Sequence, residues 1–255
     1  LSQTLADTTK SPAASVADNN YDMFLWSDSG TMRCTRGPPW TGSTSRGTGG
    51  GTTELTRISS TGPLVNANAI TNGPAANRGL YVGTIRTNAS NQVDYMVAPS
   101  AAAGGSANRV YVWNMYNRVD IASVMKASDD TWTYNTSVLR MANASSANRI
   151  TFVAGMNEDA VTADYRINVI STATSGVIVG IGLDSSAAAG PLTPDAAINT
   201  DEGSAVFAVY YGHPGLGLHF LQALEWADAD NTVTWRGDFG DPTLFQMAMS
   251  MRWRA

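Results

Sequence analysis

Residues 205–254 read AVFAVYYGHPGLGLHFLQALEWADADNTVTWRGDFGDPTLFQMAMSMRWR. Three runs of alternating apolar and polar side chains lie in this stretch, separated by residues that favour turns. In the last run every second side chain is large and apolar: Phe245, Met247, Met249, Met251 and Trp253. Alternation with a period of two residues is typical of a half-buried antiparallel strand. The stretch therefore predicts the last strands of an antiparallel β fold.

The composition of the whole chain points the same way and excludes several classes of partner. With 255 residues the chain can bury a core without disulfides, and Cys34 as its single cysteine rules out a disulfide framework or a cysteine-based zinc site. Sixteen basic residues against 21 acidic ones give a net charge of −5, so nucleic acid is not an expected partner. No apolar segment approaches the roughly 20 residues needed to cross a bilayer, so membrane insertion is not expected either.

Short strands separated by turns continue upstream and predict an all-β chain with two parts. We expect residues 1–20 to be a linker or the end of an upstream region, and residues 21–98 to form a small β module. Residues 99–107, rich in Ala, Gly and Ser, predict a flexible linker. Eight to eleven short strands then follow in residues 108–255, which indicates a jelly-roll-like β-sandwich. Residues 41–51 are almost wholly Gly, Ser and Thr and predict a loop that is mobile or ordered only by a neighbour.

Ten short motifs occur along the chain in a distinctive order. They are YDMFLWSDSGT (21–31), Trp40-Thr41, YVGTIRT (81–87), RVYVWNMYNRV (109–119), DDTWTYNT (129–136), RMANASSANRI (140–150), GMNEDAV (155–161), VIVGIGLDSS (177–186), YYGHPGLGLHFLQALEW (210–226) and WRGDFGDPT (235–243). In this order the chain resembles a family of tailed-bacteriophage virion structural proteins of the tail-fibre, spike or head-decoration type. The resemblance covers about residues 21–243 and departs from the family's pattern in the loop 36–79.

The resemblance implies a non-enzymatic role on the virion surface, reached after synthesis in the cytoplasm of the bacterial host. Other virion proteins are the implied partners, and the family offers no catalytic residues to carry over. Because fibres and spikes commonly use threefold symmetry, which closes an assembly, we expect a homotrimer. The apolar face of Phe245, Met247, Met249, Met251 and Trp253 is the expected subunit interface. The start at Leu1 also leads us to expect an upstream β region.

The two histidines are the first residues to consider for a metal or catalytic site. His213 and His219 lie six residues apart in GHPGLGLH, and a metal site would need further ligands such as Asp238 or Asp241. Strand parity places His219 about 20 Å from Glu225, too far for direct pairing. We therefore expect a structural or interface role for both histidines, and neither a metal nor a cofactor.

Paired carboxylates could support a glycosidase, which needs two of them about 5–10 Å apart. The candidate pairs are Asp129/Asp130, Glu158/Asp159, Asp201/Glu202, Asp228/Asp230 and Asp238/Asp241. Almost all lie in predicted turns, where Asp commonly caps its own backbone. A capsule depolymerase is thus less favoured than a non-catalytic protein.

Tryptophan provides a second alternative, a module that binds a host-surface glycan. The chain has seven tryptophans, of which Trp226, Trp235 and Trp253 are expected in the core because of their strand parity. Trp40, beside the Gly-rich loop, is the one expected at the surface, as a ligand or interface residue. A binding groove would then lie at loops 36–51 or 185–202.

Overall fold

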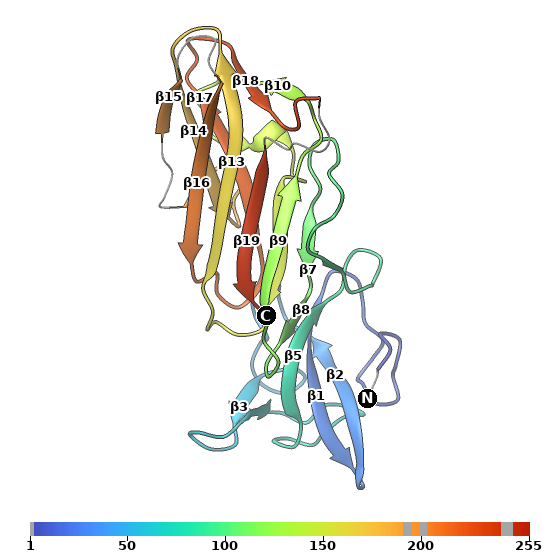
Figure 1. The fold of residues 1–255 in the computed structure, drawn as a ribbon. Helices are drawn as coiled ribbons and strands as arrows, with labels where there is room; N and C mark the ends of the chain where they lie inside the picture. The colour runs from blue at the N-terminus through green and yellow to red at the C-terminus, as the bar shows by residue number, and fades with distance from the viewer. Residues whose placement is uncertain (1–2, 191–194, 199–202, 241–246) are drawn as a thin grey trace.

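The computed structural model describes residues 3–190, 195–198, 203–240 and 247–255, and it consists almost entirely of β-strands and their connections. Figure 1 shows an elongated molecule in which a small β module adjoins one end of a long β-sandwich. The expected all-β class is confirmed. None of the helical segments in the described part of the chain has the length and apolar character needed to span a bilayer.

The module is one antiparallel sheet of six strands in the order β2-β1-β5-β4-β3, with β8 also paired to β5. Its strands are β1 (Asn20–Asp28), β2 (Thr31–Pro39), β3 (Leu55–Arg57), β4 (Leu64–Asn66), β5 (Leu80–Arg86) and β8 (Val112–Asn114). Ser29 and Gly30 join β1 to β2, and both have positive φ. Two consecutive residues with positive φ match the right-handed twist of a hairpin, so this turn sets the β1–β2 register.

The first sheet of the sandwich is organised around one long strand. It contains β9 (Asp120–Lys126), β10 (Thr131–Thr133), β13 (Val161–Ser171), β16 (Ser204–Gly212), β18 (Val233–Arg236) and β19 (Ala248–Arg254). One edge of β13 pairs with β16. The other edge pairs with β19 along its first half and with β18 at its end. Beyond them, β19 pairs with β9, and β18 pairs with β10. Alternate side chains of β13 are buried from its first residue to its last, as period-two patterning requires.

The second sheet has the order β15-β14-β17-β12-β7-β6, and β11 extends it beside β17. These strands are β6 (Tyr95–Met96), β7 (Asn108–Val110), β11 (Arg140–Met141), β12 (Arg149–Ala154), β14 (Ser175–Leu183), β15 (Asp195–Ile198) and β17 (Gly217–Ala227). A single 3-10 turn, η1 (Ala142–Ala144), follows β11. The backbone of β15 forms a strand within residues 185–202, a segment predicted to be a loop.

The two sheets of the sandwich alternate along the chain in a regular way. Counting β9 with β10, β11 with β12 and β18 with β19 as single positions, the sandwich has eight strand positions from β9 onward. In the first sheet these positions lie side by side in the order first, eighth, third and sixth. In the second sheet the order is second, seventh, fourth and fifth. Consecutive strands therefore repeatedly cross from one sheet to the other around a single core.

The apolar face of the last strand belongs to that core. Met247, Met249 and Met251 are fully buried, and Trp253 is 3% exposed with its ring 5.0 Å from that of Phe152 in the opposite sheet. The prediction of a strand here is confirmed for β19. These four side chains were predicted to form a subunit interface. They do not, because the opposite sheet of the same chain covers them. Phe245 lies outside the described residues.

The sequence-based assignment of tryptophans to the core is right for two of three. Trp235 is fully buried, and Trp253 is almost fully buried. Trp226 instead lies on the outward face of β17 and is half-buried, while the opposite parity of that strand, which includes His219 and Glu225, faces inward. Parity separated the two faces of β17 correctly, but the larger side chains are on the outer one.

The expected boundary between module and sandwich is crossed by short strands. Residues 21–98 were expected to form the module, but β6 within them pairs with β7 in the sandwich. Only Tyr111 separates β7 from β8, which pairs with β5 in the module. The segment 99–107 lies along the edge of β9, where Ser128 donates its backbone N–H to Ala102 and Ser106 donates to Lys126. This segment is hydrogen-bonded chain and does not form a free linker.

The N-terminal segment is likewise packed, although a linker was expected over residues 1–20. Arg36 of β2 is 1% exposed and donates hydrogen bonds to the backbone carbonyls of Leu5 and Ala13. Ser11 is also buried, and its hydroxyl accepts a hydrogen bond from the Arg36 backbone N–H. The described part of this segment therefore supplies acceptors to both Nη groups of a buried guanidinium.

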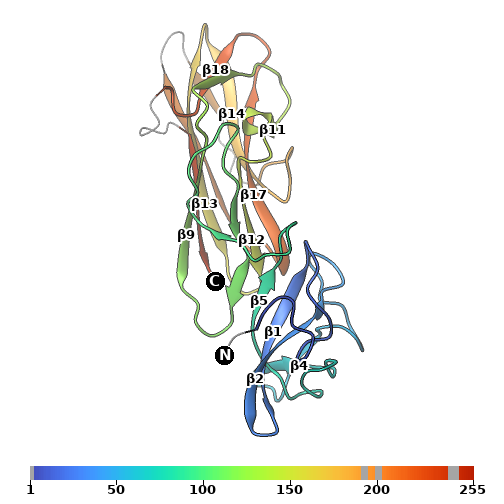
Figure 2. The same ribbon diagram turned by 90° about the vertical axis from the view of Figure 1, so that its right-hand side faces the viewer.

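The strongest link between module and sandwich comes from the Gly-rich loop. Arg46 in this loop forms a buried ion pair with Asp22 of β1, at 2.6 Å between Nε and Oδ2. Its Nη2 also donates to the backbone carbonyl of Gly155, which follows β12, at 2.6 Å. The Leu218 backbone N–H of β17 donates to the carbonyl of Ser43 in the same loop. Figure 2 shows β5 and β1 of the module below β12 and β17, where this contact lies. We call the contact of Arg46 with Asp22 and Gly155 the clasp.

We expect Asp22→Asn to lower the free energy of unfolding by about 3 kcal/mol, because it leaves the Arg46 guanidinium buried without its counter-charge. The double variant Asp22→Leu/Arg46→Met should lose less, since it removes both charges. Urea unfolding followed by tryptophan fluorescence measures these differences.

Arg57 provides the control for this experiment, because its side chain on β3 is exposed and has no carboxylate partner among the described residues. Arg57→Met should change the stability by no more than about 0.5 kcal/mol. Equal, small losses in Asp22→Asn and Arg57→Met would show that the clasp does not stabilise the fold.

Candidate ligand-binding groove

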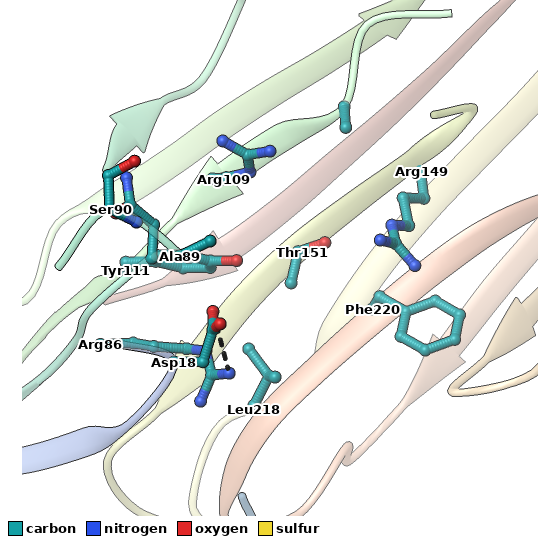
Figure 3. A pocket seen from close by; sticks show the side chains of 12 residues that line it. Asp18, Arg86, Ala89, Ser90, Arg109, Tyr111, Arg149, Thr151, Leu218 and Phe220 are labelled. Carbon is teal, nitrogen blue, oxygen red and sulfur yellow. Dashed lines mark hydrogen bonds and ion pairs between the residues drawn. The ribbon is translucent and has the colours of Figure 1, made fainter. Parts of the chain in front are cut away.

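A groove of about 550 Å³ opens where the module meets the outer face of the second sheet (Figure 3). Its volume lies in the range of small-molecule sites, about 300–1,000 Å³. Twelve residues line it: Asp18, Arg86, Asn88, Ala89, Ser90, Ala107, Arg109, Tyr111, Arg149, Thr151, Leu218 and Phe220. We call this the junction groove.

The floor of the junction groove is the outward face of β7, β12 and β17. Strand register places Thr151 beside Arg109 on one neighbouring strand and beside Phe220 on the other. These side chains point outward because Ile150 and Phe152, their neighbours of opposite parity, are fully buried in the core. The floor is therefore a row of one cation, one hydroxyl and one aromatic ring.

The wall of the junction groove comes from the module. Arg86 ends β5, and the turn after it is held by the Asn88 side-chain oxygen, which accepts the backbone N–H groups of Ser90 and Gln92 at 2.9 Å each. Arg86 also donates its backbone N–H to the carbonyl of Tyr111, between β7 and β8. This wall is hydrogen-bonded on both sides, so its side chains have a defined position.

Three arginines from different strands meet in the junction groove, and each has different partners. Arg109 forms an ion pair with Asp94 at 2.9 Å. Arg86 is 8% exposed, donates to the Asn20 side chain at 3.0 Å and lies 4.0 Å from Asp18, a loose ion pair drawn in Figure 3.

Arg149 is the third of these arginines. Its guanidinium lies over the ring of Phe220, 5.2 Å from the centroid. Within the described part of the chain no ion pair includes Arg149, and its buried Nε has no hydrogen-bond partner. Because Arg presents a planar fork of donors suited to carboxylates and phosphates, this guanidinium could hold an anionic group.

The two histidines, considered first from the sequence, do not form a ligand set. His213 is exposed, whereas His219 is buried with its Nδ1 2.7 Å from the Asp184 Oδ2 and its ring 6.0 Å from that of Phe152. Among the described residues, no three His, Cys, Asp or Glu side chains lie close enough to hold a metal ion. Neither histidine lines the junction groove.

Trp40 is placed differently from the expectation of a surface residue. It is 4% exposed, and the Arg46 guanidinium lies 4.5 Å from the centre of its ring. Its ring therefore covers the clasp, and Trp40 is not available as an exposed sugar platform.

Five of the carboxylates considered for glycosidase chemistry are engaged in turns or ion pairs. Asp238 accepts the backbone N–H of Gly240, Asp129 that of Gly104, and Asp228 that of Gly176. Glu158 and Asp159 both pair with Arg118. Three of the candidates, Asp201, Glu202 and Asp241, lie outside the described residues.

Glu225 is a buried carboxylate in the core of the sandwich. Its Oε2 accepts a hydrogen bond from the Trp132 indole at 2.8 Å, and its Oε1 lies 2.7 Å from Nη2 of Arg140. Burial raises the pKa of Glu225, while the hydrogen bond from Trp132 and the charge of Arg140 act in the opposite direction. Burial also raises the pKa of Tyr165, and the charge of Glu225 adds to that effect.

A raised pKa means that folded Glu225 retains a proton that the unfolded chain has already released. Its contribution to stability is therefore fully present below the unfolded pKa and is lost as the pH rises through the folded pKa. We expect the stability of the native protein, relative to Glu225→Gln, to be higher at about pH 4 than at pH 7. Urea unfolding at both values measures this difference. A difference that grows with pH would contradict the assignment.

The junction groove was not identified from the sequence, because its arginines are scattered singly along the chain. Arg86, Arg109 and Arg149 come from three strands that meet only through non-local pairing. Strand parity is the one available signal, since Arg149 and Thr151 share the outward face of β12. That signal identifies an outward face and not the wall opposite it.

No known family model matches this chain, and no curated protein sequence is significantly similar to it.

Proposed function

We propose that this protein is a non-enzymatic structural component of a tailed-bacteriophage virion, of the fibre, spike or head-decoration type, on the particle surface. The observation that carries the proposal is the strand order of the sandwich. An order of first-eighth-third-sixth against second-seventh-fourth-fifth supports the inference of a jelly roll with two Greek keys. Jelly rolls recur in viral capsid and lectin domains. The ten ordered sequence motifs support the same assignment.

The clasp also suits a role in a particle. The hydrogen bond from Arg46 to Gly155 and the shared β7–Tyr111–β8 segment join module and sandwich. This arrangement supports a component whose task is to hold a fixed shape.

We expect antibodies against this protein to label intact particles of the virus that encodes it, at the head, neck or tail, when they are viewed by electron microscopy. Mass spectrometry of purified, washed particles should contain its peptides in stoichiometric amounts. Peptides found only in the infected-cell lysate and absent from washed particles would contradict the virion role.

We further propose that the protein forms a homotrimer, and the surface that supports this differs from the one first expected. Three apolar side chains alternate along the outer face of β16, an edge strand: Phe207 and Tyr211 are each 62% exposed, and Val209 is 41% exposed. Exposed apolar patches are common sites of protein–protein contact. Unlike the methionine face of β19, this stripe is available to another subunit.

Light scattering on the native protein should give three times the chain mass of 26.9 kDa. The double variant Phe207→Ser/Tyr211→Ser should shift the mass toward one chain without lowering the unfolding temperature of the monomer. Val138 is 60% exposed on a different part of the surface, so Val138→Ser provides the matched control. A native protein that is monomeric in the absence of other virion proteins would contradict the trimer.

A second candidate function is a module that binds a host-surface glycan. The observation that favours it is the junction groove, which combines aromatic, apolar and hydrogen-bonding side chains at the surface. No described residue of the loops first considered lines the groove, although Leu218 in its floor donates its backbone N–H to Ser43. Arg46 of the first loop is buried in the clasp, and 191–194 and 199–202 are outside the described residues. We propose no polysaccharide cleavage, because Asp238 caps a turn and does not line the groove.

A further inference from the structure

We propose that the junction groove binds an acidic saccharide, with the carboxylate of a uronic- or sialic-acid unit held by Arg149. The inference deepens the glycan-binding function proposed above and rests on it. It names the chemical class of the ligand, which that function leaves open.

The charge of the groove is opposite to that of the chain. The whole protein carries a net charge of −5, yet the groove lining contains three arginines and a single carboxylate, Asp18. Even when Asp94, the partner of Arg109, is included, two carboxylates face three guanidiniums. An anionic ligand is therefore attracted to this site on a protein that otherwise repels anions.

Arg149 is the guanidinium with unused donors. One face of its fork lies on the Phe220 ring, and its buried Nε has no acceptor among the described residues. Among the described residues no carboxylate pairs with this guanidinium, so its terminal N–H groups on the groove side are the position for a ligand carboxylate. Figure 3 shows Arg149 beside Phe220 and on the same side of the sheet as Thr151.

Arg86 is a second cation available to the ligand. Its Nε is also buried without an acceptor in the described chain, and its contact with Asp18 is long, at 4.0 Å. Arg109 differs, since its Nη1 is 2.9 Å from Asp94. The binding charge is thus expected from Arg149 and Arg86, and Arg109 stays with its own carboxylate.

The remaining lining distinguishes a saccharide from an inorganic anion. Leu218, Phe220 and Tyr111 offer apolar surface of the kind that packs on the C–H face of a sugar ring, and Thr151 and Ser90 offer hydroxyls for sugar hydroxyls. A groove of about 550 Å³ is much larger than a phosphate or sulfate ion requires. A ring with a carboxylate uses both the apolar and the cationic parts.

The test is a calorimetric titration of the full-length native protein at low salt. The ligands are an N-acetylneuraminic-acid trisaccharide, a glucuronic-acid tetrasaccharide, neutral oligosaccharides of the same lengths, and sodium phosphate. We expect at least one acidic saccharide to bind at least tenfold more tightly than its neutral counterpart, with an affinity that falls as salt is added.

Three variants locate the binding. Arg149→Gln should weaken acidic-saccharide binding at least tenfold, whereas Arg166→Gln, on the exposed face of β13, should leave it unchanged. Ala89→Trp fills the groove from its exposed rim and should also abolish binding, while leaving all three arginines in place. It keeps the test decisive if Arg149→Gln does not fold.

The outcomes separate the ligand class from the function. Neutral oligosaccharides that bind as tightly as acidic ones, with Ala89→Trp blocking both, would leave glycan binding standing and overturn the acidic class. Binding of phosphate alone would overturn the saccharide. Absence of binding by every ligand would overturn both the inference and the glycan-binding function, and would leave the virion role untouched.

Discussion

The ion pair between Arg46 and Asp22 is the constraint on which the rest of the structure depends. Two charges are removed from water at the meeting point of module and sandwich, and each is compensated by neutral hydrogen-bonding groups as well as by the other. The Thr84 hydroxyl donates to Asp22, and the carbonyl of Gly155 accepts from Arg46. The floor of the junction groove belongs to the sandwich and its wall to the module, so contacts that join the two parts, the clasp among them, bear on the shape of that groove.

The strands could be predicted from the sequence because period-two patterning is local. The strands β16, β17 and β19 form where the alternating runs of residues 205–254 predict strands. What local patterning cannot supply is the identity of the element that covers each face. The methionine stripe of β19 has the pattern of a buried face whether the cover is another subunit or the opposite sheet. In this protein the opposite sheet covers the stripe, and that outcome is decided by the strand order and not by the stripe itself.

Because local patterning does not show which residues meet in space, it also did not predict the candidate sites. His213 and His219 are close in sequence, yet one is exposed and the other is buried against Phe152, so sequence proximity had no bearing on chemistry. Arg46 lies in a loop of small residues whose composition indicated mobility. Its order comes from one side chain that reaches a carboxylate 24 residues away and a carbonyl 109 residues away. Long-range polar contacts of this kind leave no periodic trace in a sequence.

The segment from β6 to β8 has a consequence for how such a protein could change over time. Within 20 residues the chain joins the sandwich sheet at β6, returns to it at β7, and enters the module sheet at β8. A genetic exchange at the Ala- and Gly-rich stretch between them would separate strands from the sheets they complete. We therefore expect a recombinant to fold only when module and sandwich come from the same parent or the junction residues are matched again.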